Sequence, residues 1–385
     1  MTGPLAGIRV IELAAIGPAP FAGMLLADLG ADVVRVDRPE RLGLLRPDGD
    51  SHLVLDRGRR SLSVDLKHRR GPAVVCKLAE QSDVLIEGMR PGVVERLGLG
   101  PDVLLARNPR LVYGRMTGWG QDGPDAHKAG HDINYVAVSG ALEPIAAPDG
   151  GPPVAPLNML GDFGGGGMLL AVGVVSALVH AQRTGEGQVV DASILDGAAL
   201  LTAMHRSLSH IGRWDAPRGE NLFDGGAPFY AVYRCADDRW LSVGAIEPKF
   251  YADLADGLGL SDRLPAEQQY ATSEWPRQRR LIADTVASRT RDEWVSVFAD
   301  LDACVAAVLA PHEAPDAPQP AARGVYARVD GLIHPQPAPR FTATPTRLRP
   351  GRASVGEHTA EVLAAFGCTA DEIADLLDDG TVYQA

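Results

Sequence analysis

The glycine-rich run GDFGGGG at 161–167 places one carboxylate, Asp162, beside the start of an apolar helix. Glycines let backbone N–H groups approach a reacting oxygen, so such a start can supply a base and an oxyanion site side by side. The same carboxylate can instead act only as an N-cap or first-turn acid that the helix dipole stabilises. A P-loop is excluded because no Lys-Ser/Thr pair follows the glycines. Both interpretations of Asp162 stay open on this motif alone.

Two further titratable residues stand where the chain changes character. His131 lies in KAGHDINYVAVSG, a loop that enters an apolar segment, and Glu247 closes the strand-like VGAI and precedes Pro248. Imidazole can exchange protons near neutral pH, but a lone histidine can also be a hydrogen-bonded structural residue. A carboxylate before proline suits the start of a helix, so Glu247 can be a capping or surface residue. Neither residue identifies a reaction by itself.

Three positive charges follow three successive strand-like runs. Arg38 comes after VVRVD, Lys67 after SLSVDL and Arg90 after DVLIEGM. Ligands of open parallel sheets collect at the carboxyl ends of the strands. Arginine binds phosphate in a bidentate manner and lysine as a point charge, so the set suits a ligand with several phosphates. Each cation taken singly could merely flank a turn.

The elements that must position these residues are those of an α/β protein. The first third alternates short β-branched runs with helical patterns, which predicts a doubly wound, Rossmann-like parallel sheet with crossover helices. We expect strands at 8–13, 32–37, 61–66, 84–87 and 110–115, and helices at 20–29 and 73–81. The first turn, GPAPFAG at 17–23, lacks the GxGxxG spacing of nucleotide cofactor sites, which disfavours a hydride-transferring dehydrogenase.

The pattern changes near residue 226 to a hairpin, FYAVYRC followed by WLSVGAI, and then to helical segments around Trp275 and Trp294. We therefore expect a large domain at 1–225, rejoined by 330–385, and a smaller α+β domain at 226–329. The helix after the glycine run is expected to reach residue 182. Its apolar core, 168–179, is shorter than a membrane span requires.

Composition limits the possible partners and compartment. The formal charge of −12 is spread along 385 residues, which argues against a nucleic-acid surface. Four scattered cysteines without CxxC spacing predict neither a zinc site nor a disulfide framework, and no metal is expected. The N-terminal segment lacks the regions of a signal peptide. A cytoplasmic protein without membrane attachment is the expectation.

A series of ordered segments, spread over nearly the whole chain, carries a resemblance to a known family. With these segments the chain resembles the type III CoA-transferase family and, within it, the α-methylacyl-CoA racemases of bacterial type. They are GPLAGIRVIELAAIGPAPFAGMLLADLGADVVRVDRP, RGRRSLSVDLK, DVLIEGMRPGVVERLGLGP, RMTGWGQDGP, GHDINYVAVSG, LNMLGDFGGGGMLLAVG, GQVVDASILDG and GGAPFYAVYRCADDRWLSVGAIEPKFY.

The resemblance implies roles for individual residues. The His of GHD and the Asp of GDFGGG, here His131 and Asp162, are the two acid/base residues, and the Glu of GAIEP, here Glu247, hydrogen-bonds the histidine. The residues that contact CoA fall on Arg38, Lys67, Arg90, Arg96 and Arg60. The implied assembly is an interlocked homodimer in which both chains build each site. Coenzyme A enters as part of the substrate, so no separate cofactor is expected.

The expected reaction interconverts (R)- and (S)-2-methylacyl-CoA thioesters by proton removal and return through an enolate. Such a reaction needs two groups on opposite faces of the α-carbon, here His131 and Asp162, with Glu247 supporting the imidazolium. The alternative within the family is CoA transfer with Asp162 as the nucleophile. An inactive CoA-thioester-binding regulator would keep the cations without a competent acid/base pair. The acyl group is not identified by the sequence.

Overall fold

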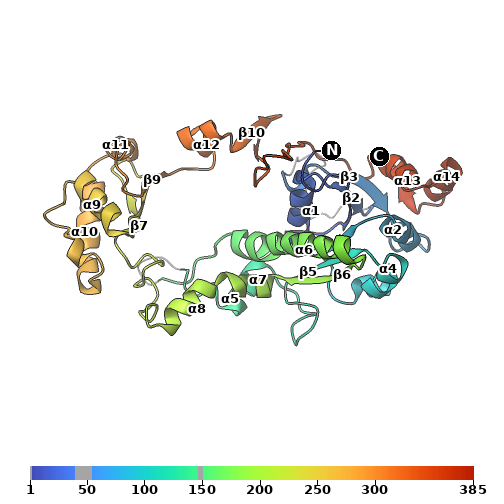
Figure 1. The fold of residues 1–385 in the computed structure, drawn as a ribbon, viewed down its shortest axis with the longest axis horizontal. Coiled ribbons are helices and arrows are strands. Elements are labelled where there is room, and N and C mark those ends of the chain that lie inside the picture. Colours follow the sequence, from blue (N-terminus) through green and yellow to red (C-terminus); the bar gives the residue numbers. More distant parts are fainter. Residues whose placement is uncertain (1, 40–53, 146–150) are drawn as a thin grey trace. The chain divides into compact units, whose positions relative to one another are not determined.

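A computed structural model describes residues 2–39, 54–145 and 151–385 of the chain (Figure 1). The chain divides into two compact units. The first comprises Met1–Ser139, Leu157–Leu201 and Gly324–Ala385, and the second comprises Gly140–Pro156 and Thr202–Arg323. This division differs from the expected boundaries at 226 and 329. Polar contacts explain part of the difference, because Arg218 forms an ion pair of 2.9 Å with Glu143, and hydrophobic periodicity does not reveal such contacts.

The first unit is built on a seven-stranded sheet in the order β12-β3-β2-β1-β4-β5-β6. Strands β1 to β6 are parallel and β12 joins β3 in antiparallel orientation. Without β12, this is the strand order of doubly wound dinucleotide-binding sheets, so the expected parallel sheet is confirmed. The strands are β1 (Arg9–Leu13), β2 (Asp32–Asp37), β3 (Arg60–Val64), β4 (Val84–Glu87), β5 (Val112–Thr117), β6 (Gln188–Ser193) and β12 (Val382–Tyr383).

Helices cover both faces of this sheet, and the alternation of strand side chains assigns each face to its own core. Ile11, Leu85 and Tyr113 pack with α2 (Gly71–Ala79), α4 (Pro101–Arg107), α13 (Thr359–Ala365) and α14 (Ala370–Asp378). Val10, Ile86 and Val112 pack with α1 (Pro18–Asp28), α5 (Asp132–Ser139) and α6 (Leu169–Thr184). The unit also contains the 3₁₀ turn η1 (Val54–Asp56), α3 (Val93–Arg96), the π-helix η2 (Met159–Met168), α7 (Ile194–Leu201), β10 (Tyr326–Val329) and β11 (Leu332–Pro335).

The second unit has a three-stranded antiparallel sheet in the order β7-β8-β9, which confirms the hairpin expected from FYAVYRC and WLSVGAI. Its core includes Phe229, which directly precedes β7, and Tyr251 and Trp294 from two of the helices. The elements are α8 (Ala203–His210), β7 (Tyr230–Arg234), β8 (Trp240–Gly244), α9 (Pro248–Gly257), η3 (Ala266–Gln268), η4 (Thr272–Glu274), α10 (Trp275–Val286), α11 (Arg291–Val297), β9 (Val305–Val308), η5 (Ala314–Asp316) and α12 (Pro318–Arg323).

One helical run within the described residues, Met159–Thr184, is long and apolar enough to cross a membrane by length and composition alone. Its apolar window has a mean hydropathy of 1.7 and is 44% buried. The expected apolar core at 168–179 is therefore part of a longer helical segment, because η2 continues directly into α6. In Figure 1, α6 runs alongside β5 and β6, and it packs against both strands. A core helix of a soluble protein meets the same criterion, so the run is weak evidence for a membrane span.

Candidate active site

A cavity of about 440 Å³ opens at the carboxyl edge of the parallel sheet and is lined entirely by the first unit. The segments that follow β1, β2, β4, β5 and β6 all contribute to its wall. The strand order reverses at β1. Strands β2 and β3 are added on one side of β1, and β4, β5 and β6 are added on its other side. Crevices at such switch points are the usual ligand sites of doubly wound sheets.

Asp162 lines this cavity from within the π-helix η2 rather than from a position just before a helix. The expectation that the helix follows the glycine run is therefore wrong, since the helical run already begins at Met159 and contains these glycines. Turns of π-helix occur often at functional sites. Burial raises the pKa of Asp162, and the nearby Asp132 carboxylate raises it further, while Asn158 and His131 act in the opposite direction. The carboxyl group is thus moved toward a state in which it can both donate and accept a proton.

The glycines around Asp162 serve close packing of η2. A Cβ on Gly165 would lie 2.7 Å from the backbone nitrogen of Ala198 in α7, and one on Gly167 would lie 2.5 Å from the carbonyl oxygen of Pro18 in α1. The amide of Asp162 donates to the Asp132 side chain at 2.6 Å. We expected backbone amides of the glycine run to face a reacting oxygen. For Asp162 this expectation is wrong, because its amide is hydrogen-bonded to the Asp132 side chain.

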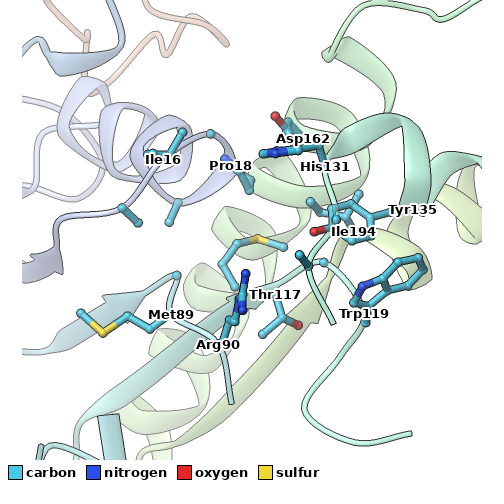
Figure 2. A pocket seen from close by; sticks show the side chains of 18 of the residues that line it. Ile16, Pro18, Met89, Arg90, Thr117, Trp119, His131, Tyr135, Asp162 and Ile194 are labelled. Atoms are coloured by element: carbon cyan, nitrogen blue, oxygen red, sulfur yellow. The ribbon is translucent and has the colours of Figure 1, made fainter. Parts of the chain in front are cut away.

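His131 lines the same cavity from the loop that enters α5. Its backbone amide donates to Asn134 Oδ1 at 3.0 Å, and its carbonyl accepts from the Asn134 amide at 2.8 Å, so the start of α5 fixes the histidine backbone. The side chain is exposed. Figure 2 shows His131 and Asp162 on one rim of the cavity, across from Arg90 and Met89. The two acid/base candidates, which stand 31 positions apart in the sequence, are thereby brought together.

Glu247 belongs to the second unit, where it is the N-cap residue of α9 and is exposed. Its expected hydrogen bond to His131 stays a prediction. No three His, Cys, Asp or Glu side chains among the described residues form a group that could hold a metal ion.

The predicted CoA-contacting cations divide into three groups. Arg38 and Arg90 line the cavity from the ends of β2 and β4. Lys67 follows β3 and Arg96 lies in α3. Both residues are exposed, and neither lines the cavity. Arg60 stands at the amino end of β3, where its guanidinium donates to Asp32 at 2.7 Å and to Glu361 at 3.0 Å. The contact of Arg60 with CoA stays a prediction that this placement does not favour.

Sequence reasoning missed the aromatic wall of the cavity. Tyr135 is 8% exposed, and its ring lies edge-on to Trp119 with centroids 4.7 Å apart. Figure 2 shows its hydroxyl directed toward the cavity. A Cβ on Gly118 would lie 2.0 Å from the Tyr135 ring, so the glycine leaves room for it. The segments Gly-Trp-Gly at 118–120 and Gly-His-Asp-Ile-Asn-Tyr at 130–135, which follow β5, were the available signal. Lys128, also in the wall and paired with Asp125 at 2.5 Å, was missed too.

The family model for CoA-transferase family III matches residues 5–359. The chain belongs to this family. A human protein named alpha-methylacyl-CoA racemase is 46% identical over 97% of this chain and 96% of its own length. The mouse protein of the same name is 45% identical over 98% of this chain and 97% of its own.

The fold is shared with solved structures. A crystal structure of Rv3272 from M. tuberculosis has a TM-score of 0.76 and 27% identity, covering 93% of this chain and 99% of that one. A curated relative with the same designation is named probable fatty acyl-CoA transferase. Membership in the family thus leaves two reaction types to be separated by the chemistry of the site.

Proposed function

We propose that this chain is an α-methylacyl-CoA racemase that interconverts (R)- and (S)-2-methylacyl-CoA thioesters. The observation that carries the proposal is that His131 and Asp162, two proton-exchanging groups, line one cavity together with Arg38 and Arg90. A thioester bound with its phosphates near the arginines would present its acyl end to the opposite rim. The identity to two proteins named as racemases supports the same reaction.

The proposed reaction proceeds by two proton transfers. In one direction neutral His131 removes the α-proton and protonated Asp162 returns a proton to the opposite face; in the other direction the states are exchanged. The enolate formed between the transfers needs hydrogen-bond donors at its oxygen. The first amides of α5, at Asp132 and Ile133, have no intrahelical carbonyl to bond and are the nearest such donors in sequence to His131. Glu247 would orient His131 and stabilise its protonated form.

Substrate binding is proposed to rest on remote charges. Arg38 and Arg90 in the cavity wall, with Lys67 and Arg96 outside it, would hold the phosphates of CoA. Binding energy from these contacts would be realised as orientation of the α-carbon between the two acid/base groups. The CoA moiety arrives with the substrate, so the reaction as proposed uses no separate cofactor and no metal.

We further propose a cytoplasmic homodimer with interlocked chains. Exposed apolar side chains at the end of η2 and in α6 and α7 support a partner surface, because exposed apolar surface can mark an interaction site. Five of them are between 46% and 60% exposed, namely Met168, Val172, Val179, Leu200 and Leu201. In this assembly Glu247 would reach the His131 of the other chain.

CoA transfer is the second candidate, because the half-buried Asp162 could also attack a thioester carbonyl. The separating experiment is incubation of the enzyme with a single-epimer 2-methylacyl-CoA in deuterated water, without an acceptor acid. Racemisation predicts inversion together with deuterium at the α-carbon. Retention of configuration without deuterium, and turnover only after a carboxylic acid is added, would establish the transferase instead.

A further inference from the structure

The first turn of α5 carries a buried carboxylate that the proposed reaction does not itself use. Asp132 follows His131 directly, begins α5 and is 8% exposed. Its Oδ1 accepts a hydrogen bond of 2.6 Å from the backbone amide of Asp162, which lies 30 positions further along the chain. One side chain therefore joins the segment that carries His131 to the segment that carries Asp162.

We propose that Asp132 is a positioning residue, which holds the two acid/base segments together and places a negative charge beside Asp162 during proton exchange. The inference rests on the proposed racemase function. It concerns neither a contact with substrate nor a direct proton transfer by Asp132.

The surroundings of Asp132 favour a role beyond stability. Its second oxygen, Oδ2, is buried and has no hydrogen-bonding partner among the described residues. A buried charge that is only partly hydrogen-bonded costs free energy, and the helix dipole at the start of α5 offsets only part of this cost. A Cβ on Gly161 would lie 2.3 Å from Asp132 Oδ1, so glycine at this position is required for the carboxylate to reach the amide.

The charge of Asp132 acts on Asp162 directly. Burial is the largest influence that raises the pKa of Asp162, and the Asp132 carboxylate is the second. His131 from the start of α5 and Asn158 before η2 oppose it, and Tyr135 of α5 also senses the Asp162 charge. α1 and α7 face this segment with Pro18, Ile194 and Ala198, which are uncharged. Asp132 is thus the one carboxylate that acts on Asp162 within this described neighbourhood.

Two substitutions separate the tether from the charge. Asp132→Asn keeps an oxygen acceptor for the Asp162 amide but removes the charge, so the acid limb of the kcat/KM profile should move to lower pH. Asp132→Ala removes both, and kcat should fall by about tenfold or more, since a charge-assisted hydrogen bond that orients a reacting group is lost. Asp132→Asn should restore much of that kcat. In each variant, kcat/KM must change by the same factor in both directions of the reaction, because an enzyme variant cannot alter the equilibrium constant between the two epimers.

Asp83→Asn is the matched control. Asp83 also accepts a hydrogen bond from a distant backbone amide, that of Arg9 at 2.8 Å, but at the amino edge of the sheet. This variant should leave the acid limb unchanged. If wild type racemises but Asp132→Asn shows the wild-type acid limb, the inference is overturned. If wild type does not racemise, the proposed function fails first. Should Asp132→Ala not fold, the limb shift in Asp132→Asn decides the question alone.

Discussion

Glu87 Oε2 accepts a hydrogen bond of 2.7 Å from the backbone amide of Met89, which fastens the turn leading to Arg90 onto the end of β4. The same carboxylate accepts from Arg115 in β5 at 3.1 Å, and Arg115 also pairs with Glu95 at 2.8 Å. Glu87 is fully buried. The position of Arg90, which we propose to bind substrate, therefore depends on a buried, titratable contact.

This contact predicts a pH dependence of stability. Burial raises the pKa of Glu87 to about 7, from an ordinary value of 4.5. Between these values the folded chain holds a proton that the unfolded chain has lost, so the contribution of Glu87 to stability falls as pH rises from about 4.5 to about 7. The free energy of unfolding of Glu87→Gln, relative to wild type, should increase across this window by about 3 kcal/mol at most.

Urea unfolding at a series of pH values measures this difference. Glu361→Gln is the control for loss of a carboxylate paired with an arginine at the surface. A difference between Glu87→Gln and wild type that stays constant across the window would contradict the assignment.

The second prediction concerns the basic residues that follow the strands and their effect on the KM for acyl-CoA. Arg38→Glu removes a charge-assisted phosphate contact and adds repulsion, so the KM for acyl-CoA should rise by about tenfold or more. Lys67→Ala should have a smaller effect, because Lys67 lies outside the cavity wall. Arg110→Glu reverses an exposed charge before β5, at the opposite sheet edge, and should leave KM unchanged. Unchanged thioester affinity in both Arg38→Glu and Lys67→Ala would exclude the phosphate site.

The third prediction concerns assembly. Light scattering at assay concentration should report a dimer, and a fully active monomer would remove the shared-site proposal. A mixed dimer provides the sharper test. If each site takes His131 from one chain and Glu247 from the other, a dimer of His131→Ala and Glu247→Ala chains has one intact site. It should then recover about half of the wild-type activity, since the sites of a twofold dimer are equivalent. No recovery would place both residues in one chain.

The fourth prediction separates the two acid/base groups. Loss of either His131 or Asp162 should nearly abolish racemisation, because each turnover needs a donor and an acceptor. Exchange with solvent should survive on one face in each variant: with His131→Ala, Asp162 can remove and return a proton without inversion, and Asp162→Ala should show the complementary epimer preference. Glu247→Gln should slow both directions less severely than loss of His131. Mass spectrometry of the deuterated epimers measures each outcome.

The transferase alternative makes a different prediction for the loss of His131. Asp162 would then be indispensable as a covalent nucleophile, whereas loss of His131 would have a modest effect on acyl transfer. Incubation with substrate and hydroxylamine, followed by mass spectrometry, tests for a hydroxamate at Asp162. Its formation would overturn the two-base assignment, and its absence together with epimer-selective exchange would support it.

The parallel sheet and the cations after its strands were predictable from local sequence. Fully buried strands are continuous β-branched runs, and successive parallel strands deliver their following residues to one edge. β4 was placed at its observed bounds, and β5 within two residues of them. The approximate positions of Arg38, Lys67 and Arg90 follow from these patterns because each depends on neighbours in the chain. The roles of His131, Asp162 and Glu247 came from the family resemblance, since no local pattern pairs residues so far apart.

Which of these residues meet was decided only by the tertiary structure. Strand order places β2 and β4 on either side of β1, so Arg38 and Arg90 share a cavity, while Lys67 follows β3, one strand further out. Arg60, which the resemblance assigned to CoA contact, instead donates to Asp32 and Glu361 from distant segments of the chain. The contact between Asp132 and the Asp162 amide likewise depends on a π-helix and on glycine contacts with α1 and α7. Such long-range packing leaves no periodic trace in the chain, and for that reason the sequence alone could not reveal it.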